Sequence, residues 1–243
     1  GYYVEDLKDN SASVTGGTYK PGGLKLKCDE DGQPIKERLG NTIAPVMGGF
    51  GFDGHIGNFD FNFFFNYSVG NVILNGTKLL SSFQTGSKKG YNLNKFALGN
   101  RYSWIDPATG LNLSAESTAV KEAYGDMMTA GLRLNELNRN AQIYNPASMT
   151  QAQIYDYAVE DASFLRINNI TIGYTLPKTW VKKAFLQNVR IYLTGYNLYC
   201  WTNYSGSDPE VDTMSKKNAM NPGIDYAAYP KSRTFVGGIN VTF

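Results

Sequence analysis

One fifteen-residue stretch, GNFDFNFFFNYSVGN at residues 57–71, alternates almost strictly between large apolar and polar side chains. Successive side chains of a β-strand point to opposite faces, so this period predicts a strand with two different faces. One face carries Phe59, Phe61, Phe63, Phe65, Tyr67 and Val69, and the other carries Asp60, Asn62, Phe64, Asn66 and Ser68. The aromatic face must be covered, either by a second sheet in a sandwich or by lipid around a transmembrane barrel. This strand alone does not decide between them.

Similar alternation recurs along the chain. We expect strands near 46–53, 59–70, 163–176, 188–201 and 233–243. The turn predicted at 53–58 contains Asp-Gly and joins the first two strands in a hairpin. The last strand, RTFVGGINVTF, is predicted to pair antiparallel with the strand around 189–199. Its residues Phe235, Ile239, Val241 and Phe243 share one face and are expected to form a closing strand.

The lengths of the connections alternate between short and long. The short ones lie at 53–58 and 177–187, and the long ones at 71–162 and 201–232. Transmembrane barrels have short periplasmic turns and longer outer loops, and Trp180, Tyr199 and Trp201 near strand ends suit interfacial aromatic belts. The pattern therefore favours an all-β fold: an antiparallel transmembrane β-barrel fragment of about five or six strands with long extracellular loops.

Composition argues against several other classes. The formal net charge is +2 without a long basic run, which gives no reason to expect nucleic acid or an anionic lipid surface as a partner. Cys28 and Cys200 are far apart with one histidine, His55, to join them, so neither a zinc site nor a disulfide is expected. No nucleophile motif or paired-carboxylate signature is recognisable, so we expect a protein that is not an enzyme and has no cofactor. The absence of an initiator Met or a signal segment suggests a piece of a longer protein.

Several short motifs follow one another in the C-terminal third: DASFLR, GYTLP, YNL, DPE, GIDY, YP and RTF before a terminal aromatic. In residue identity and in order along the chain, this series of motifs resembles the SusC/RagA family of TonB-linked outer-membrane proteins. The resemblance is strong over 160–243 and looser over 40–75. The resemblance implies part of a large plugged barrel that imports oligosaccharides or peptides across the outer membrane. It also implies a SusD-like lipoprotein lid, energy from the TonB complex through an N-terminal region that this chain lacks, and contact with outer-membrane lipid. By the same resemblance, the C-terminal strand with Phe235, Ile239, Val241 and Phe243 is expected to be read by the outer-membrane assembly machinery.

Candidate site residues follow from these patterns. The residues expected to face the lumen or the plug are Asp60, Asn62, Asn66, Arg190 and Thr194. The loop residues considered for contact with substrate or lid are Tyr91, Tyr102, Trp104, Asp106, Tyr204 and Asp208, with simple packing of the loop aromatics as the alternative.

Other segments carry weaker expectations. CDEDGQPIKERLGN retains Asp29, Asp31 and Gly32 of a calcium loop but lacks the remaining acidic series, so a solvated loop is preferred. Residues 117–139 predict a packing helix with Ala119, Ala123, Met127 and Ala130 on one face. Two alternative functions stay open: a secreted carbohydrate-binding β-sandwich module and a passive porin.

Overall fold

The computed structural model describes residues 1–9, 22–82, 84, 92–98, 100–148, 153–210 and 222–243. The chain divides into two compact units. The first unit, here called the mixed unit, comprises residues 1–39 and 74–159, and the second, the sheet unit, comprises 40–73 and 160–243. No helix within the described ranges is long and apolar enough to cross a membrane.

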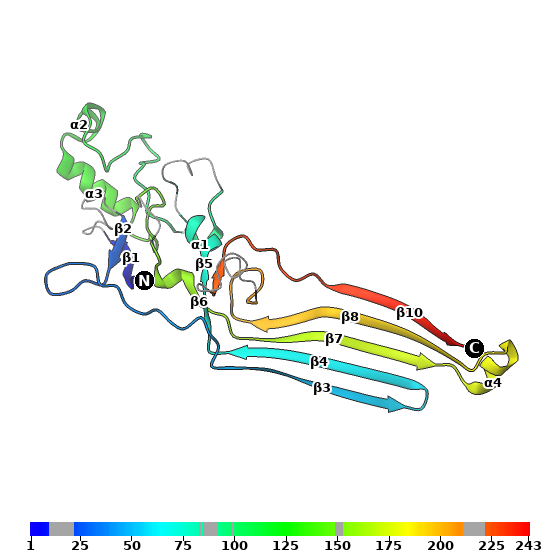
Figure 1. Ribbon diagram of the computed structural model, residues 1–243. Coiled ribbons are helices and arrows are strands. Elements are labelled where there is room, and N and C mark those ends of the chain that lie inside the picture. The colour runs from blue at the N-terminus through cyan, green and yellow to red at the C-terminus, as the bar shows by residue number, and fades with distance from the viewer. Residues whose placement is uncertain (10–21, 83, 85–91, 99, 149–152, 211–221) are drawn as a thin grey trace. The chain divides into compact units, whose positions relative to one another are not determined.

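The sheet unit is built on a five-stranded antiparallel sheet with the order β10-β8-β7-β4-β3 (Figure 1). Its strands are β3 (Val46–Ile56), β4 (Phe59–Val69), β7 (Phe164–Thr175), β8 (Asn188–Thr202) and β10 (Thr234–Thr242). Each strand end lies within three residues of its predicted position. The C-terminal strand β10 pairs antiparallel with β8 from Thr234↔Tyr196 to Thr242↔Asn188, which confirms the predicted partner.

The first hairpin is tighter than predicted. β3 and β4 pair without interruption from Val46↔Val69 to Ile56↔Phe59, so only residues 57–58 form the turn and the predicted turn at 53–58 is wrong. Gly57 has φ 60°, and glycine is favoured at the first central position of a two-residue hairpin because it adopts positive φ without a steric cost. The extra strand residues place Asp53 and His55 on the sheet itself.

One bulge explains an irregularity in the sequence of β7. The apolar residues Leu165 and Ile167 precede Ile170 and Ile172, so the alternation skips a step in mid-strand. The register shifts between Ile167 and Asn169, where β7 pairs with β8, and Phe65 and Phe64 of β4 face the same break. An extra residue in a bulge lets the strand keep its apolar side chains on one face through the skip.

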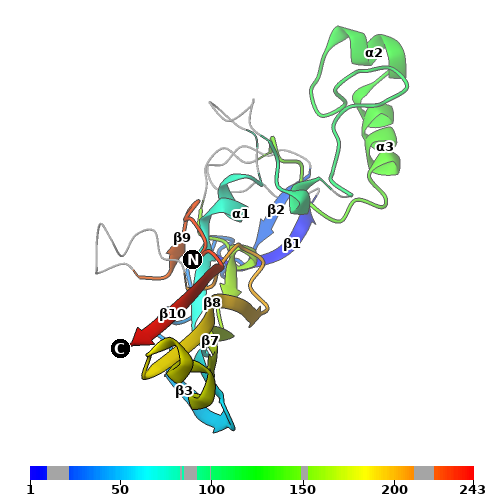
Figure 2. The same ribbon diagram turned by 90° about the vertical axis from the view of Figure 1, so that its right-hand side faces the viewer.

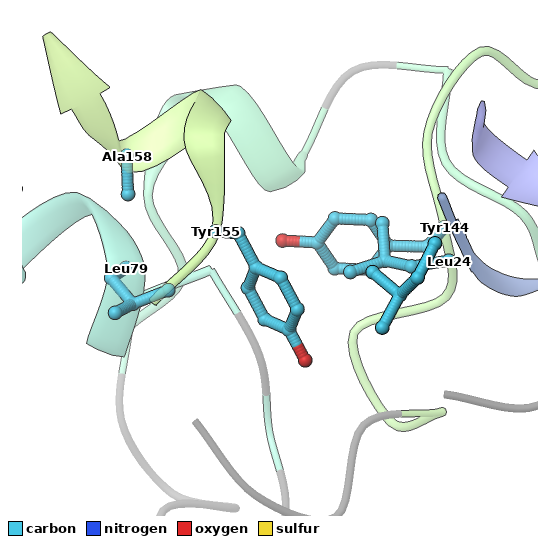
Figure 3. Packing of buried hydrophobic residues seen from close by; sticks show 6 residues of the cluster. Leu24, Leu79, Tyr144, Tyr155 and Ala158 are labelled. Atoms are coloured by element: carbon cyan, nitrogen blue, oxygen red, sulfur yellow. The ribbon is translucent and has the colours of Figure 1, made fainter. Parts of the chain in front are cut away.

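The long connection at 71–162 contains more regular structure than the one helix that the sequence predicts. It contains α1 (Gly76–Leu80), α2 (Thr118–Tyr124), α3 (Met127–Leu137) and the 3-10 turns η2 (Lys95–Ala97) and η3 (Asp156–Ala158). The hairpin β1 (Val4–Asp9) and β2 (Gly23–Leu26) completes the mixed unit. Its core joins Leu24, Leu79, Tyr144, Tyr155 and Ala158, which converge from separate segments (Figure 3).

The segment at 117–139 forms two helices, not one (Figure 2). Gly125, at φ 83°, ends α2, and Asp126 begins α3 by accepting a hydrogen bond from Thr129 N at 2.6 Å. This break changes the buried face: Val120, Ala130 and Leu134 are buried, whereas the predicted Ala119 and Ala123 are exposed.

The remaining elements are short. β6 (Val159–Asp161), β5 (Val72–Asn75) and β9 (Ile224–Asp225) form a three-stranded sheet in that order. The connection at 177–187 contains α4 (Lys178–Val181) and the 3-10 turn η4 (Lys182–Ala184), and Figure 1 shows α4 at the same end of the five-stranded sheet as the C-terminus.

Candidate functional site

The five-stranded sheet has one face made almost entirely of apolar and aromatic side chains. Residues paired across antiparallel strands share a face, so the register collects this set without a single charged or amide side chain. Its members are Val46, Phe50, Phe52, Ile56, Phe59, Phe61, Phe63, Phe65, Tyr67, Val69, Leu165, Ile167, Ile170, Ile172, Tyr174, Val189, Ile191, Leu193, Tyr199, Trp201, Phe235, Ile239 and Val241. Much of this apolar face is open: 61% of Phe52 and 64% of Ile239 are exposed.

Aromatic rings contact one another across neighbouring strands of the apolar face. Phe50 of β3 stacks on Phe65 of β4 with ring centroids 5.1 Å apart, and Phe59 meets Tyr174 of β7 at 4.7 Å. The Phe61 ring lies over Gly54, in space that a Cβ would occupy. The rings thus support one another within the sheet, and within the described part of the sheet unit no second sheet covers them.

The opposite face is polar, and an ion pair crosses it near the end that carries the short turns. Asp60 lies on β4 and Arg190 on β8, with β7 between them. Arg190 Nε donates to Asp60 Oδ1 at 2.9 Å, and Arg190 Nη2 donates to Oδ2. The residue beneath the pair is Gly173, where a Cβ would lie 2.5 Å from both Asp60 carboxylate oxygens and 2.6 Å from Arg190 Nη2. Only glycine leaves room for this bidentate pair, which the sequence did not reveal.

Hydrogen bonds between side chains cross the middle of the polar face. Asn169 donates to Asn62 Oδ1 at 2.7 Å, and Asn62 donates to Asp53 Oδ1 at 2.7 Å. Between β7 and β8 the hydroxyls of Thr171 and Thr194 lie 2.8 Å apart, with Thr194 buried. These hydrogen bonds join β3, β4, β7 and β8 across the polar face and satisfy polar side chains there.

A second ionic cluster, here called the Arg166 cluster, lies at the other end of the polar face. Arg166 is 4% exposed and Asp208 3%, and Arg166 Nη2 donates to Asp208 Oδ1 at 2.6 Å. Arg166 Nε lies 2.6 Å from Glu210 Oε2, which also accepts from Lys231 Nζ at 2.8 Å, and Glu210 Oε1 accepts from Asn66 at 3.2 Å. Asp208 further accepts from the backbone N–H groups of Glu210, at 3.0 Å, and Lys231, at 3.1 Å. The cluster fixes the segment after β8 to the sheet.

All five residues predicted to face the lumen or plug therefore lie on this one polar face: Asp60, Asn62, Asn66, Arg190 and Thr194. Their contact with a lumen or a plug stays a prediction. Sequence reasoning missed Gly173, Glu210 and Lys231. The sequence signal that could have identified Gly173 was a glycine at one of the alternating polar positions of its strand. For Glu210, the signal was its place in the DPE motif.

The predicted loop residues have mainly internal contacts. The Tyr204 hydroxyl donates to Asp225 at 2.6 Å, and burial, together with this bond, raises the pKa of Tyr204. Tyr204 and Asp208 are both buried in the sheet unit. A direct contact of either side chain with substrate or lid stays a prediction, and it would require these bonds to open. Tyr91 lies outside the described residues.

The other three predicted loop residues lie in the mixed unit. Tyr102 is buried in the core cluster, with Trp104 packed half-buried against it. Asp106 accepts hydrogen bonds from Arg133 Nε at 3.0 Å and from Tyr124 at 2.6 Å, and these bonds, with one from the Ala108 backbone, hold its pKa at about 2. Trp104 also lines a cavity of about 240 Å³ with Arg101 and Asn145. Substrate contact at this cavity stays a prediction.

The acidic turn considered for calcium is closed by its own backbone. Gln33 N donates to Asp29 Oδ1 at 2.7 Å, and Gly32 adopts φ 77°. Across the described ranges, no group of three or more His, Cys, Asp or Glu side chains is arranged to hold a metal ion.

Comparisons with known proteins agree on one group. A TonB-dependent receptor, P3, from Formosa agariphila is 30% identical over 248 residues, which cover 100% of this chain and 21% of that protein. The TonB-dependent receptor SusC from Bacteroides thetaiotaomicron is 32% identical over 122 residues, covering 49% of this chain and 11% of SusC. The chain therefore spans about a fifth, or less, of the length of these relatives. A comparison with models of protein families finds no match.

Solved structures show the same fold. A structure of the RagAB peptide transporter matches with a TM-score of 0.62 at 22% identity, covering 100% of this chain and 22% of that chain. The open-open state of the RagAB peptide importer matches with a TM-score of 0.61 at 21% identity. The antiparallel sheet thus matches part of the β-barrel of such a receptor.

Proposed function

We propose that this chain, which belongs to the SusC/RagA family of TonB-dependent outer-membrane proteins, forms part of the wall of a transport barrel in the outer membrane. The observation that carries the proposal is the difference between the two faces of the five-stranded sheet. Among the residues paired in register, one face has no charged or amide side chain, and the other face carries two ionic clusters. A barrel wall needs an apolar exterior toward lipid and tolerates polar groups toward an aqueous interior.

The apolar face meets the requirements of a lipid-facing surface. β3 and β4 each have 11 residues, and about 9–11 residues cross a bilayer in a tilted strand. A soluble sandwich would need a second layer over this face. The exposure of Phe52 and Ile239 supports lipid over that alternative.

The polar face is proposed to line the interior of the barrel. Asp60 and Arg190 would present a paired but partly exposed charge to the plug or to solvent. The Arg166 cluster would hold the segment after β8 at the outer mouth. These groups position the wall and its loops, and no chemical step is assigned to them.

By family, the intact protein would act with partners. We propose a SusD-like lipoprotein as the outer lid and the TonB complex as the energy source, the latter acting through residues beyond this chain. The cargo would be an oligosaccharide or a peptide. RagAB, whose structures this chain resembles, is a peptide importer. Uptake of labelled peptides and of labelled oligosaccharides by cells carrying the full-length protein would separate the two cargo classes.

The decisive test uses two neighbouring phenylalanines on β4. Phe63 lies on the apolar face and Phe64 on the polar face. In the full-length receptor, Phe63→Arg near the bilayer midplane is expected to lower the free energy of unfolding from lipid by about 2–4 kcal/mol. Phe64→Arg is the matched control and should cost less, because an arginine there meets water.

Urea unfolding of both variants in lipid vesicles measures the difference. Equal losses, or a larger loss for Phe64→Arg, would mean that the apolar face does not meet lipid, and the proposal would be abandoned.

A further inference from the structure

The helical connection between β7 and β8 has an unusual surface. Its inner side packs on the strand end, where Val181 and Val189 are both buried. Its outer side carries two open aromatic rings: Trp180 is 62% exposed and Phe185 is 94% exposed. Three exposed lysines accompany them, Lys178, Lys182 and Lys183. We call these two aromatics and three lysines the lysine–aromatic turn.

The charge of this region is one-sided. Residues 162–207 contain no Asp or Glu, and their five basic residues are Arg166, Lys178, Lys182, Lys183 and Arg190. The two arginines are paired with acids from other elements. The three lysines have no ion pair with any residue in the part of the chain that the structure describes. Their positive charge therefore faces outward without compensation there.

The backbone holds one of the aromatic rings in the open. Phe185 has φ 58°, in the left-handed region that bulky residues rarely adopt. Its amide nitrogen donates to Lys182 O at 3.2 Å, which closes the turn. Residues in such conformations are often kept for function, because the conformation costs free energy. A hydrophobic contact with Phe185 would offset that cost.

We propose that the lysine–aromatic turn binds anionic phospholipid headgroups at the rim of the barrel. The inference rests on the proposed function, in which the apolar face of β7 and β8 lies in lipid up to this end. Aromatic rings sit well at a membrane interface, and clustered lysines attract anionic lipid. Short turns lie on the periplasmic side of such barrels, so the lipid would belong to the periplasmic leaflet. The near-neutral net charge of the whole chain conceals this local cluster.

The test places a fluorophore beside the turn. The full-length receptor, with Cys28→Ser and Cys200→Ser, receives a bimane label at Thr179→Cys and is reconstituted into phosphatidylcholine vesicles. Brominated phosphatidylglycerol or brominated phosphatidylcholine is added, and quenching reports which lipid lies at the turn. We expect phosphatidylglycerol to quench at a lower mole fraction, with the preference weakening as salt is raised.

Charge-removal variants give the specific readout. A basic residue near an anionic surface contributes about 1 kcal/mol, which is about fivefold in affinity. The triple variant Lys178→Gln/Lys182→Gln/Lys183→Gln should therefore lose up to about 100-fold of the phosphatidylglycerol preference. The control Lys36→Gln/Lys95→Gln/Lys121→Gln removes equal charge from the mixed unit and should retain the preference. Phe185→Asn, which suits positive φ, should weaken quenching by both lipids.

The outcomes separate the two proposals. If the labelled receptor enters vesicles but both lipids quench equally, or if the triple variant keeps the preference, the headgroup site is refuted and the barrel function stands. If the receptor does not enter lipid at all, both proposals fail.

Discussion

Asp208 is the residue whose replacement should most disturb the sheet unit. It is 3% exposed and accepts three hydrogen bonds, one from Arg166 and two from backbone N–H groups. In Asp208→Ala, the 2.6 Å bond to Arg166 is lost and the two N–H groups lose their acceptor. Breaking a buried ion pair by removing one partner costs about 3–5 kcal/mol. Glu210 still contacts Arg166, so we expect a loss near the lower end of that range.

Two further variants separate the causes. Asp208→Asn keeps the shape and one acceptor oxygen but loses the charge, so a loss of about 2–3 kcal/mol is expected. In an Arg166→Met background no buried cation is left behind, and Asp208→Ala should cost at least about 1 kcal/mol less than in the native background. Asp31→Ala, in an exposed turn of the mixed unit, is the control and should be nearly neutral.

The assay is urea unfolding of the full-length receptor in lipid vesicles, combined with amide hydrogen exchange of residues 203–210. Loss of the cluster should speed exchange in this segment, because Asp208 and Glu210 fix it to the sheet. If Asp208→Ala unfolds like the native protein, or if its effect simply adds to that of Arg166→Met, the cluster does not hold the segment and this reasoning is wrong.

Three other predictions concern single residues. Gly173→Val should cost about 1–3 kcal/mol, because its side chain would displace Arg190 from the ion pair; native denaturation curves would contradict this. The pKa of Asp106 is about 2 beside Arg133, below the unfolded value near 3.9, so its contribution to stability is complete above about pH 4 and is lost as pH falls toward 2. Acid unfolding of Asp106→Asn should lack that component, and an unchanged profile between pH 4 and 2 would count against it. Replacing Phe243 by Asp in the full-length protein should lower the amount assembled in the outer membrane more than uptake per molecule, whereas normal assembly with lost uptake would assign the residue to the substrate path.

The strands of the sheet unit were predictable because each has a face that must avoid water. Alternation of period two located β4 and β10 within two residues at each end. The order of the predicted strands along the chain identified the partner of β10, because consecutive strands usually pair and β8 is the predicted strand that precedes β10. The hairpin turn was placed too early because Asp53-Gly54 is a strong turn signal, yet the pairing continues past it to Ile56.

The mixed unit was not predictable in the same way. Its core assembles from segments distant in sequence, such as β2 with α1 and Tyr144, and no short-range period records such contacts. The helical segment was recognised, but Gly125 resets the helix and changes which side is buried. Periodicity across the whole segment therefore selected Ala119 and Ala123 wrongly.

The candidate site was predictable residue by residue but not as a set of contacts. Alternation assigned Asp60 and Arg190 to the same face, because it indicates the face of the sheet to which each side chain points. Alternation does not predict that Asp60 of β4 and Arg190 of β8 form an ion pair across β7. The pair forms because glycine at position 173 of β7 has no side chain to block it. Burial of Asp208 was likewise hidden, since DPE in a long connection is typical of an exposed turn.

The two edges of the five-stranded sheet set the last constraint on function. β3 and β10 are the outer strands, each paired on one side only within the described part of the chain. In hydrocarbon no water can bond the free N–H and C=O groups of such an edge, and each unsatisfied group costs several kcal/mol. Over 11 and 9 residues that cost exceeds the stability of an ordinary domain. The apolar face therefore enters lipid only when further strands pair with both edges, and the wall that we propose is a property of the closed barrel and not of this sheet alone.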